Sequence, residues 1–342
     1  MIRNNKRIIF LFIFLTLLAL FNVITSIFFK SQEFVIKTKQ CQATDDGLEL
    51  FAESLRAGKF EKLAKENREK YLSMSPFPHI AFEGAIPPSL IASLQEEMDE
   101  TKILDNQCYQ NATACFLKKG YQYLKSTIND ETMMGYHTRM TYSIMRSQLF
   151  SNFLTDLTNI SNLIPEHTPG GVSYTAPGGY LALHSDYNAR PGTGLNRRIN
   201  CFLFLNDDWH ESYGGDLEMW SQDKKQCQAR IAPLEGRLVI FTTTDYSWHG
   251  QPEPLTAPNG RLRRSIAFYF YTTGARNPED CSEKNCSILH STMFVEPEGC
   301  KKCADPACEN YEDTDDVVNA DFYASSKRGA SENALVHEET KE

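Results

Sequence analysis

The pattern of apolar and polar positions divides the chain into a helical first part and a strand-rich second part. Between residues 30 and 70, apolar positions recur at helical spacing among many charges, which predicts a tether followed by one or two amphipathic helices. A short apolar run at 80–82 then predicts a strand. The apolar positions after Pro87 and Pro88 predict a further helix, because proline is well placed in a first helical turn.

From about Gly171 to Thr273 the period changes to that of short strands. Five apolar or alternating runs are separated by turn residues, namely "GYLALHSD", "INCFLFLN", "GDLEMW", "GRLVIFTTT" and "RRSIAFYFYTT". No segment of helical period lies between them, whereas a parallel sheet would need crossover helices. The pattern therefore predicts a mainly β protein with flanking helices, built as an antiparallel sandwich or barrel.

The most apolar stretch of the chain lies near its start. Residues 8–29 contain 22 residues without a formal charge. As a helix they would be about 33 Å long, enough to cross a hydrocarbon core of roughly 30 Å. We expect a transmembrane signal anchor at 8–29, a cytoplasmic tail at 1–7 and a stem or helical linker at 30–74. The alternative is a cleaved signal peptide, whose apolar region normally runs about 7–15 residues.

Composition and charge exclude one class of function. With 41% hydrophobic residues, the chain has the composition of an ordinary globular protein. Its net charge of −9 and the absence of a Lys/Arg run argue against a nucleic-acid partner. Much of the negative charge lies in residues 309–342, which are poor in apolar residues and are predicted to be a disordered acidic tail.

The ten cysteines indicate the redox compartment. Most fall in close groups, and outside the cytosol such groups are typical of disulfides. Residues 276–308 form a Cys-rich segment in which a disulfide framework is the favoured interpretation. Zinc is the alternative, since four thiolates could bind it. That set would be Cys286, Cys300, Cys303 and Cys308.

Three N-x-S/T sequons, at Asn111, Asn159 and Asn285, are compatible with glycosylation and hence with a lumenal body. Together with the cysteines and the predicted anchor at 8–29, they indicate a single-pass type II membrane protein. We therefore expect its catalytic body to face the lumen of the endoplasmic reticulum or Golgi.

A histidine and an aspartate two residues apart end the first of the five runs. His184 and Asp186 would share one face of a strand, a pattern that alone is common at strand ends. A second histidine, His249, follows another apolar run. Two imidazoles and one carboxylate are the facial ligand set of non-heme ferrous oxygenases. The sequence therefore predicts a catalytic Fe(II) site at these three residues.

The last run, "GRLRRSIAFYFYT", carries two adjacent arginines. Strand alternation puts Arg263 and Ser265 on one face and Arg264 on the other. An inward guanidinium needs an anionic partner, because an unpaired buried charge is costly. The carboxylate of a cosubstrate would be such a partner, and Ser265 could donate to the same group. The alternative places both arginines on a solvated outer face.

These blocks, taken in order, resemble a known family. H-x-D, "INCFLFLNDDW", "YGGDLEMW", a distal histidine and R-x-S are similar to the motifs of Fe(II)/2-oxoglutarate-dependent dioxygenases, most closely of the prolyl 4-hydroxylase-like branch. The opening "PFPHIAFEGAIPPSL" also resembles the start of that domain. The resemblance covers roughly residues 75–275 and implies a double-stranded β-helix, or jelly roll, with supporting helices.

The resemblance also implies roles for single residues. His184, Asp186 and His249 match the iron ligands, and Arg263 matches the basic residue that binds the distal carboxylate of 2-oxoglutarate. Tyr174, ten residues before His184, matches a cosubstrate-binding tyrosine of some relatives. L-Ascorbate is implied as a reductant.

Two positions depart from the family's pattern. Collagen-type enzymes usually carry Lys at the position of Arg263, and Phe204 stands where part of the Arg-bearing branch has a tyrosine. The cosubstrate's polar contacts therefore cannot all be carried over to this chain.

The implied activity is hydroxylation of a C–H bond, with peptidyl proline in the secretory lumen as the first substrate to consider. A glycan, a lipid or a small molecule is the alternative substrate. From other classes, Asp313 and Asp315 formally match the D-x-D signature of a lumenal glycosyltransferase, and a non-catalytic jelly-roll binding module is a third hypothesis. Arg197 and Arg198 receive no role from the sequence.

Overall fold

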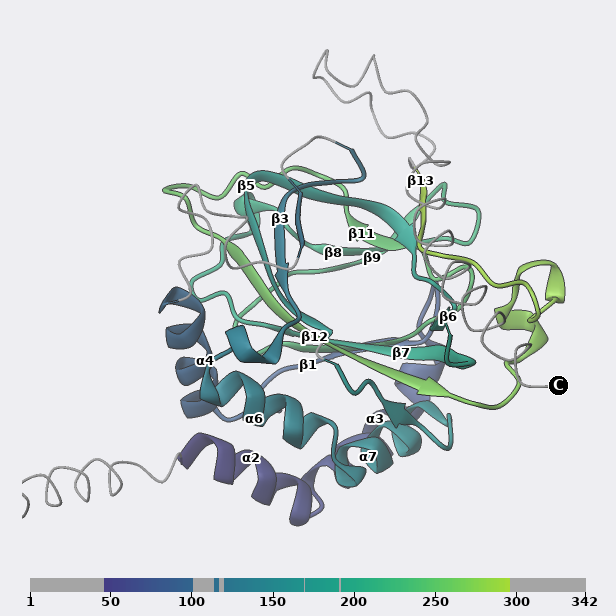
Figure 1. The fold of residues 1–342 in the computed structure, drawn as a ribbon, viewed down its shortest axis with the longest axis horizontal. Coiled ribbons are helices and arrows are strands. Elements are labelled where there is room, and N and C mark those ends of the chain that lie inside the picture. Colours follow the sequence, from purple (N-terminus) through teal and green to yellow (C-terminus); the bar gives the residue numbers. More distant parts are fainter. Residues whose placement is uncertain (1–45, 101–113, 117–119, 169, 191, 296–342) are drawn as a thin grey trace, which may run out of the picture.

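Antiparallel strands in two facing layers form the body of the protein, as the computed structural model shows (Figure 1). The long strand β5 (Gly171–Ser185) contributes to both layers, because its first half pairs with β12 and its end pairs with β11. The antiparallel barrel with flanking helices agrees with the pattern of apolar positions, and the jelly-roll form agrees with the family resemblance. The structure describes residues 46–100, 114–116, 120–168, 170–190 and 192–295.

Every strand pairing in the described part of the chain is antiparallel. The main path runs in the order β1 (His79–Phe82), β10 (Leu238–Thr242), β7 (Leu195–Phe204), β12 (Arg263–Thr272), β5, β11 (His249–Gln251), β8 (Leu217–Trp220) and β9 (Cys227–Ile231). Shorter or lateral strands are β2 (Ala114–Phe116), β3 (Gln122–Ile128), β4 (Ile164–Pro165), β6 (Ala189–Arg190) and β13 (Met293–Val295). The five runs expected to be strands lie in β5, β7, β8, β10 and β12.

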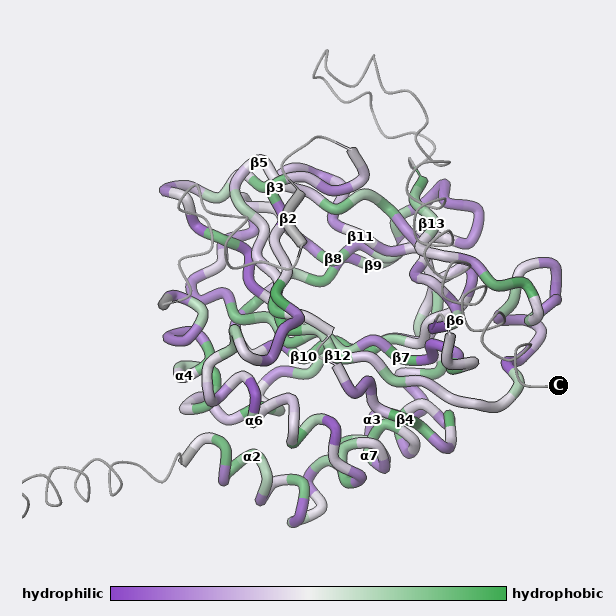
Figure 2. Tube along the Cα trace, in the orientation of Figure 1, coloured by the Kyte–Doolittle hydropathy of each residue, from purple (hydrophilic) through white to green (hydrophobic). Residues whose placement is uncertain are grey.

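Helices cover the outer side of the layer that contains β1, β7 and β12 (Figure 1). They are α2 (Asp46–Arg56), α3 (Lys59–Ser73), α4 (Pro88–Glu100), α6 (Tyr136–Met145) and α7 (Gln148–Thr158), with short 3-10 turns η1 (Glu131–Met133), η2 (Glu211–Tyr213), η3 (Pro278–Asp280) and η4 (Ser282–Lys284). Apolar and polar residues alternate along these helices (Figure 2), so each helix has one face that can pack on the sheet.

The folded domain begins earlier than the sequence predicts. Helices α2 and α3 lie in the segment assigned to the stem, yet the side chain of Phe51 is fully buried and Phe60 packs edge-on against Phe153 of α7 at 5.0 Å. The hydroxyl of Tyr71 also shares a 2.7 Å hydrogen bond with that of Thr242 on β10. The apolar faces of α2 and α3 thus pack against the rest of the fold. The folded domain therefore includes both helices and extends back at least to Asp46.

The predicted tail at 1–7, the anchor at 8–29 and the acidic tail at 309–342 lie outside the described residues. Within the described ranges, no helix combines the length and the apolar character needed to cross a membrane.

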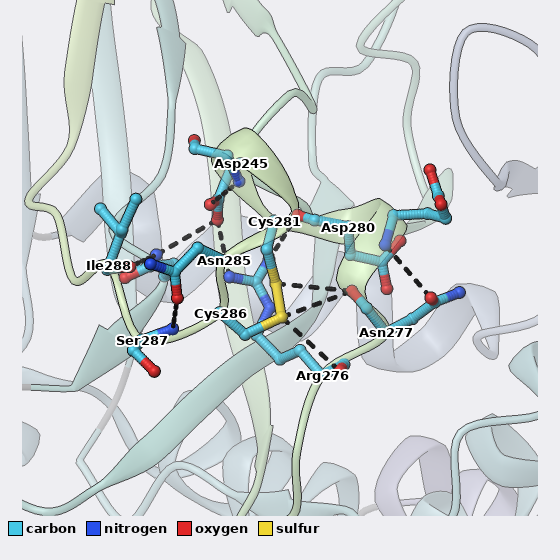
Figure 3. Close-up of a disulfide and its surroundings, with 12 residues drawn as sticks. Asp245, Arg276, Asn277, Asp280, Cys281, Asn285, Cys286, Ser287 and Ile288 are labelled. Atoms are coloured by element: carbon cyan, nitrogen blue, oxygen red, sulfur yellow. Dashed lines mark hydrogen bonds and ion pairs between the residues drawn. A yellow bond between two sulfur atoms is a disulfide. The ribbon is translucent and has the colours of Figure 1, made fainter.

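A disulfide confirms part of the cysteine prediction. Cys281 and Cys286 are bonded, with their Cα atoms 5.1 Å apart (Figure 3). Cys286 is therefore not available to the alternative zinc set, whose other members lie outside the described residues. Cys201 is a buried free thiol.

A buried ion pair holds the disulfide segment on the barrel (Figure 3). Asp245, in the loop between β10 and β11, lies 2.6 Å from Arg276, and their side chains are 0% and 2% exposed. The second carboxylate oxygen of Asp245 accepts a 2.7 Å hydrogen bond from the backbone N–H of Ser282. Arg276 also donates to the carbonyl of Asp280. The domain therefore extends beyond residue 275, to β13.

Replacing Asp245 by asparagine is expected to lower the free energy of unfolding by about 3–5 kcal/mol, because it removes the one carboxylate that pairs directly with the buried Arg276 guanidinium among the described residues. Burial alone would raise the pKa of Asp245, but its hydrogen bonds and Arg276 hold it well below the usual range. The ion pair therefore stabilises the fold above the unfolded-state pKa of about 3.9, and this stability is lost as the pH falls through the folded pKa.

Urea unfolding at neutral pH and near pH 3 checks this expectation, since the difference between wild type and Asp245→Asn should shrink in acid. Glu279→Gln is the matched control, because its pair with Lys284 is 68% and 70% exposed. Equal loss of stability in the two variants would contradict the assignment.

Candidate metal centre

Two neighbouring strands bring the predicted metal ligands together. His184, at the end of β5, lies directly opposite His249 of β11 in the strand register, and Asp186 follows β5. Nε2 of His249 is 3.5 Å from Oδ2 of Asp186, and Nε2 of His184 is 3.8 Å from Oδ1. One ligand atom from each residue lies within 4.8 Å of the others, and all three are buried. The structure thus assembles the set predicted from the sequence.

Backbone carbonyls orient both imidazoles toward a metal. Nδ1 of His184 lies 2.9 Å from the carbonyl of Ala182, and Nδ1 of His249 lies 2.8 Å from that of Ser247. A proton on each Nδ1 donates to the carbonyl, which leaves the lone pair of each Nε2 directed into the site. Burial, reinforced by His249, lowers the pKa of His184 to about 3, and burial lowers that of His249. Neutral imidazoles and a carboxylate fit Fe(II).

Arg197, which received no role from the sequence motifs, holds the carboxylate of Asp186. Its Nη2 lies 3.2 Å from Oδ2 of Asp186, and Asn200 donates a 2.7 Å hydrogen bond to the same oxygen. Burial alone would raise the pKa of Asp186, but Arg197 and the two histidines more than offset this, so the pKa lies well below its usual range. Oδ2 takes both bonds, which leaves Oδ1 available to a metal.

Arg197 is itself fixed from several sides. Its guanidinium lies 3.8 Å from the ring centroid of Tyr269 and 4.6 Å from that of Tyr187. Its Nε donates a 2.9 Å hydrogen bond to Asn200. Two adjacent arginines just before the apolar run of β7 were the signal in the sequence, and they did not reveal the partner of Arg197.

Arg197→Met is expected to weaken divalent-metal binding by about 10–100-fold, as the loss of outer-shell partners usually does. Titration of the purified chain with Mn(II) measures the effect. Arg198→Met is the neighbouring control, because Arg198 points to Asp280 at 3.5 Å instead. Equal metal affinities in the two variants would remove the role assigned to Arg197.

The two adjacent arginines of β12 take opposite faces, as alternation predicts. Arg264 faces the helices, where it lies 2.6 Å from Asp99 and 2.8 Å from Asp207. Arg263 faces the barrel interior, where its guanidinium lies 4.8 Å from the ring of Phe204. Burial lowers the pKa of Arg263 to about 10, so it is still a cation at neutral pH. In the described part of the chain no carboxylate oxygen lies within 4.0 Å of its guanidinium.

The same interior contains the metal ligands. Phe204 belongs to the inner apolar cluster with Phe241, whose ring centroid is 4.8 Å from that of His249. Ser265, opposite Phe204 in the register, is on the same face of β12 as Arg263. Arg263 and Ser265 thus share the inner face with the triad, as the sequence predicts.

A glycine turn fixes the arginine's stem. The Nε of Arg263 donates a 2.6 Å hydrogen bond to the carbonyl of Gly215. Gly215 has a φ of +81°, and a Cβ there would lie 2.7 Å from Leu255 and 3.1 Å from Arg263. Only glycine allows this turn to approach so closely. The glycine pair of "YGGDLEMW" is therefore a structural turn.

Tyr174 does not join this site. Its hydroxyl points to the carbonyl of Met98 at 3.5 Å, and its ring is buried in the core beneath the helices. In the register it lies opposite Arg264, on the helix-facing side, so its neighbour Thr175 takes the inward position. Extra residues of β5 bulge out between Thr175 and Tyr180. Such a bulge changes which residues of β5 point inward. A residue spacing counted back from His184 along the sequence does not include this change.

Comparison with known proteins identifies the class. Residues 170–271 match the family model described as 2OG-Fe(II) oxygenase superfamily. The matched segment contains all three triad residues and Arg263. This segment, with its buried H-x-D…H triad, is therefore that of a 2OG-Fe(II) oxygenase.

Several solved structures are similar in fold. A prolyl hydroxylase from Trichoplax adhaerens, solved with a hypoxia inducible factor peptide, is 16% identical over 63% of this chain and 92% of its own, with a TM-score of 0.47. A Pseudomonas putida prolyl-4-hydroxylase is 17% identical over 63% of this chain and 100% of its own, with a TM-score of 0.43. Because both scores are below 0.5, the class assignment rests on the family match and the triad.

Proposed function

We propose that the protein is an Fe(II)- and 2-oxoglutarate-dependent hydroxylase of peptidyl proline in the secretory lumen. The observation that carries the proposed chemistry is the buried triad, whose two free Nε2 atoms and one free carboxylate oxygen converge beside an interior guanidinium. When bound, Fe(II) supplies the coupling of substrate hydroxylation by dioxygen to the oxidative decarboxylation of 2-oxoglutarate. The balance is R–H, O₂ and 2-oxoglutarate giving R–OH, succinate and CO₂.

The chain's own residues orient the reactants and exclude water. His184, Asp186 and His249 would hold the metal from rigid strands, and Arg263 would bind the distal carboxylate of 2-oxoglutarate with bidentate charged hydrogen bonds. Ser265 supplies a hydroxyl on the same face. Phe204 and Phe241 line the inner wall between the arginine and His249, which keeps the site dry. L-Ascorbate is proposed as the reductant that maintains Fe(II).

Peptidyl proline is proposed from the order of the sequence motifs, which is that of the prolyl 4-hydroxylase-like branch. The named neighbours from Trichoplax adhaerens and Pseudomonas putida are prolyl hydroxylases. Their sequence identity to this chain is too low to decide the substrate. Glycans, lipids and small molecules with an unactivated C–H bond are therefore tested as alternative substrates.

A disulfide and two exposed sequon asparagines support the proposed lumenal compartment. The Cys281–Cys286 disulfide fits an oxidising compartment. Asn159 and Asn285, two of the three sequon asparagines, are exposed, so an attached glycan would have room. Membrane anchoring through residues 8–29 is proposed from their apolar length alone.

Neither rival function has comparable support. The D-x-D of the glycosyltransferase hypothesis, Asp313 to Asp315, lies outside the described residues. A non-catalytic binding module would have no need of neutral imidazoles, a supported carboxylate and an interior arginine that touches no carboxylate of the described residues.

The test is release of succinate from 2-oxoglutarate by the purified full-length chain, with Fe(II) and a pool of proline-containing peptides. We expect turnover and a gain of one oxygen atom on proline, detected by mass spectrometry, and neither with His184→Ala. Turnover with a glycan or lipid pool alone would replace the proposed substrate. No metal binding and no turnover with any pool would sink the hydroxylase proposal.

A further inference from the structure

Lys125, on β3, lies in one row with Arg263 on the inner face of the sheet. Lys125 is opposite Thr175 in the pairing of β3 with β5, and Arg263 is opposite the same Thr175 in the pairing of β12 with β5. Residues directly opposite one another on neighbouring strands point to the same face. The row Lys125, Thr175 and Arg263 therefore crosses three strands with all side chains inward.

Hydrogen bonds support this direction. The ammonium of Lys125 donates to the hydroxyl of Thr127 at 3.0 Å, and that hydroxyl lies 3.1 Å from the hydroxyl of Ser173. Ser173 in turn is opposite Ser265 on β12. A second row of hydroxyl groups thus lies beside the row of the two cations, on the same inner face.

The two cations share a face without a carboxylate of the described residues in contact with either, and the charge of Asp216 acts on Arg263 only from beyond 4.0 Å. Of the residues that the structure describes, none places a carboxylate oxygen within 4.0 Å of the Lys125 ammonium or the Arg263 guanidinium. Arg264, one residue further along β12, has two such partners, Asp99 and Asp207. Burial and then the charge of Arg263 lower the pKa of Lys125 to about 8. Because neither cation has a described carboxylate in contact, an anionic ligand bound between them would stabilise both charges.

We propose that Lys125 is a second cosubstrate-binding cation, which grips the distal carboxylate of 2-oxoglutarate together with Arg263. This inference rests on the proposed function, and it adds a reason why the site would select 2-oxo acids with a charged tail. The arginine supplies a planar fork and the lysine a point charge, with the Thr175 hydroxyl between them. A 2-oxo acid with an uncharged tail cannot satisfy either cation, so the enzyme selects an anionic tail.

The experiment measures binding of 2-oxoglutarate to the full-length chain loaded with Mn(II), by calorimetry, for wild type and Lys125→Met. We expect the variant to raise the Kd for 2-oxoglutarate by about tenfold or more, the usual effect of losing a hydrogen bond to a charged group. The Kd for 2-oxopentanoate, which has an uncharged tail, should not change. Lys62→Met is the control, because the Lys62 side chain is 76% exposed.

Thermal unfolding gives an independent readout. Without ligand, Lys125→Met should unfold at the same temperature as wild type or higher, because a like-charge repulsion has been removed. Its stabilisation by added 2-oxoglutarate should be smaller than that of wild type.

Three results would overturn the inference: an unchanged Kd for 2-oxoglutarate, an equal loss of affinity for both 2-oxo acids, or a lower unfolding temperature with unchanged affinity. The last would make Lys125 a structural residue. In each case binding by wild type leaves the proposed function standing. Failure of metal-loaded wild type to bind 2-oxoglutarate would instead remove the proposed function itself.

Discussion

His249→Ala is expected to abolish turnover and to weaken divalent-metal binding by more than the roughly 10–100-fold that outer-shell partners contribute. His249 supplies one of three ligand atoms, and its Nδ1 is already committed to the carbonyl of Ser247. No other imidazole lies beside Asp186 to replace it, since the only further member of the group is His184 among the described residues.

Mn(II) titration together with succinate release measures both losses. His210→Ala is the matched control, because His210 is exposed and bonds only to nearby Ser212. Circular dichroism on both variants separates loss of metal from loss of fold. Wild-type metal affinity in a folded His249→Ala protein would disprove the assignment of the triad.

Arg263→Met is expected to raise the KM for 2-oxoglutarate by about 30-fold or more, because losing one partner of a buried charge pair costs about 2–5 kcal/mol. The kcat at saturating 2-oxoglutarate should change much less, since the lost contact is to the part of the cosubstrate that does not react.

Arg264→Met is a control one residue away. Arg264 bonds to Asp99 and Asp207 on the opposite face, so its loss should lower the unfolding temperature and leave the KM unchanged. A higher KM for Arg264→Met than for Arg263→Met would reverse the two faces of β12. Steady-state kinetics and thermal unfolding on both variants decide the point.

The sequence determined the chemistry because that chemistry follows local rules. Alternation along a strand separates Arg263 from Arg264, as the structure confirms. The H-x-D spacing likewise brings His184 and Asp186 to one site, although Asp186 lies just beyond β5. The change of period near Gly171 likewise predicts an antiparallel β fold. That change can be seen in the sequence, because it depends only on which positions are apolar.

Tertiary structure decided which partners those residues meet. Lys125 and Arg197 receive no role from the sequence motifs. Only the pairing of β3 with β5 brings Lys125 to the face that carries Arg263, and only the fold of β7 brings Arg197 to Asp186. Tyr174 was misplaced because a bulge in β5 changes the phase between it and His184.

The bounds of the domain were also decided by tertiary contacts. Helix α2 carries an apolar stripe that a stem helix could also carry, and only the presence of α4 and α7 shows that the stripe is buried. By itself, the sequence determined the residue types of the metal site and the face that each occupies on its own strand. Contacts between distant strands required the fold, because register and bulges are set by packing across the whole sheet.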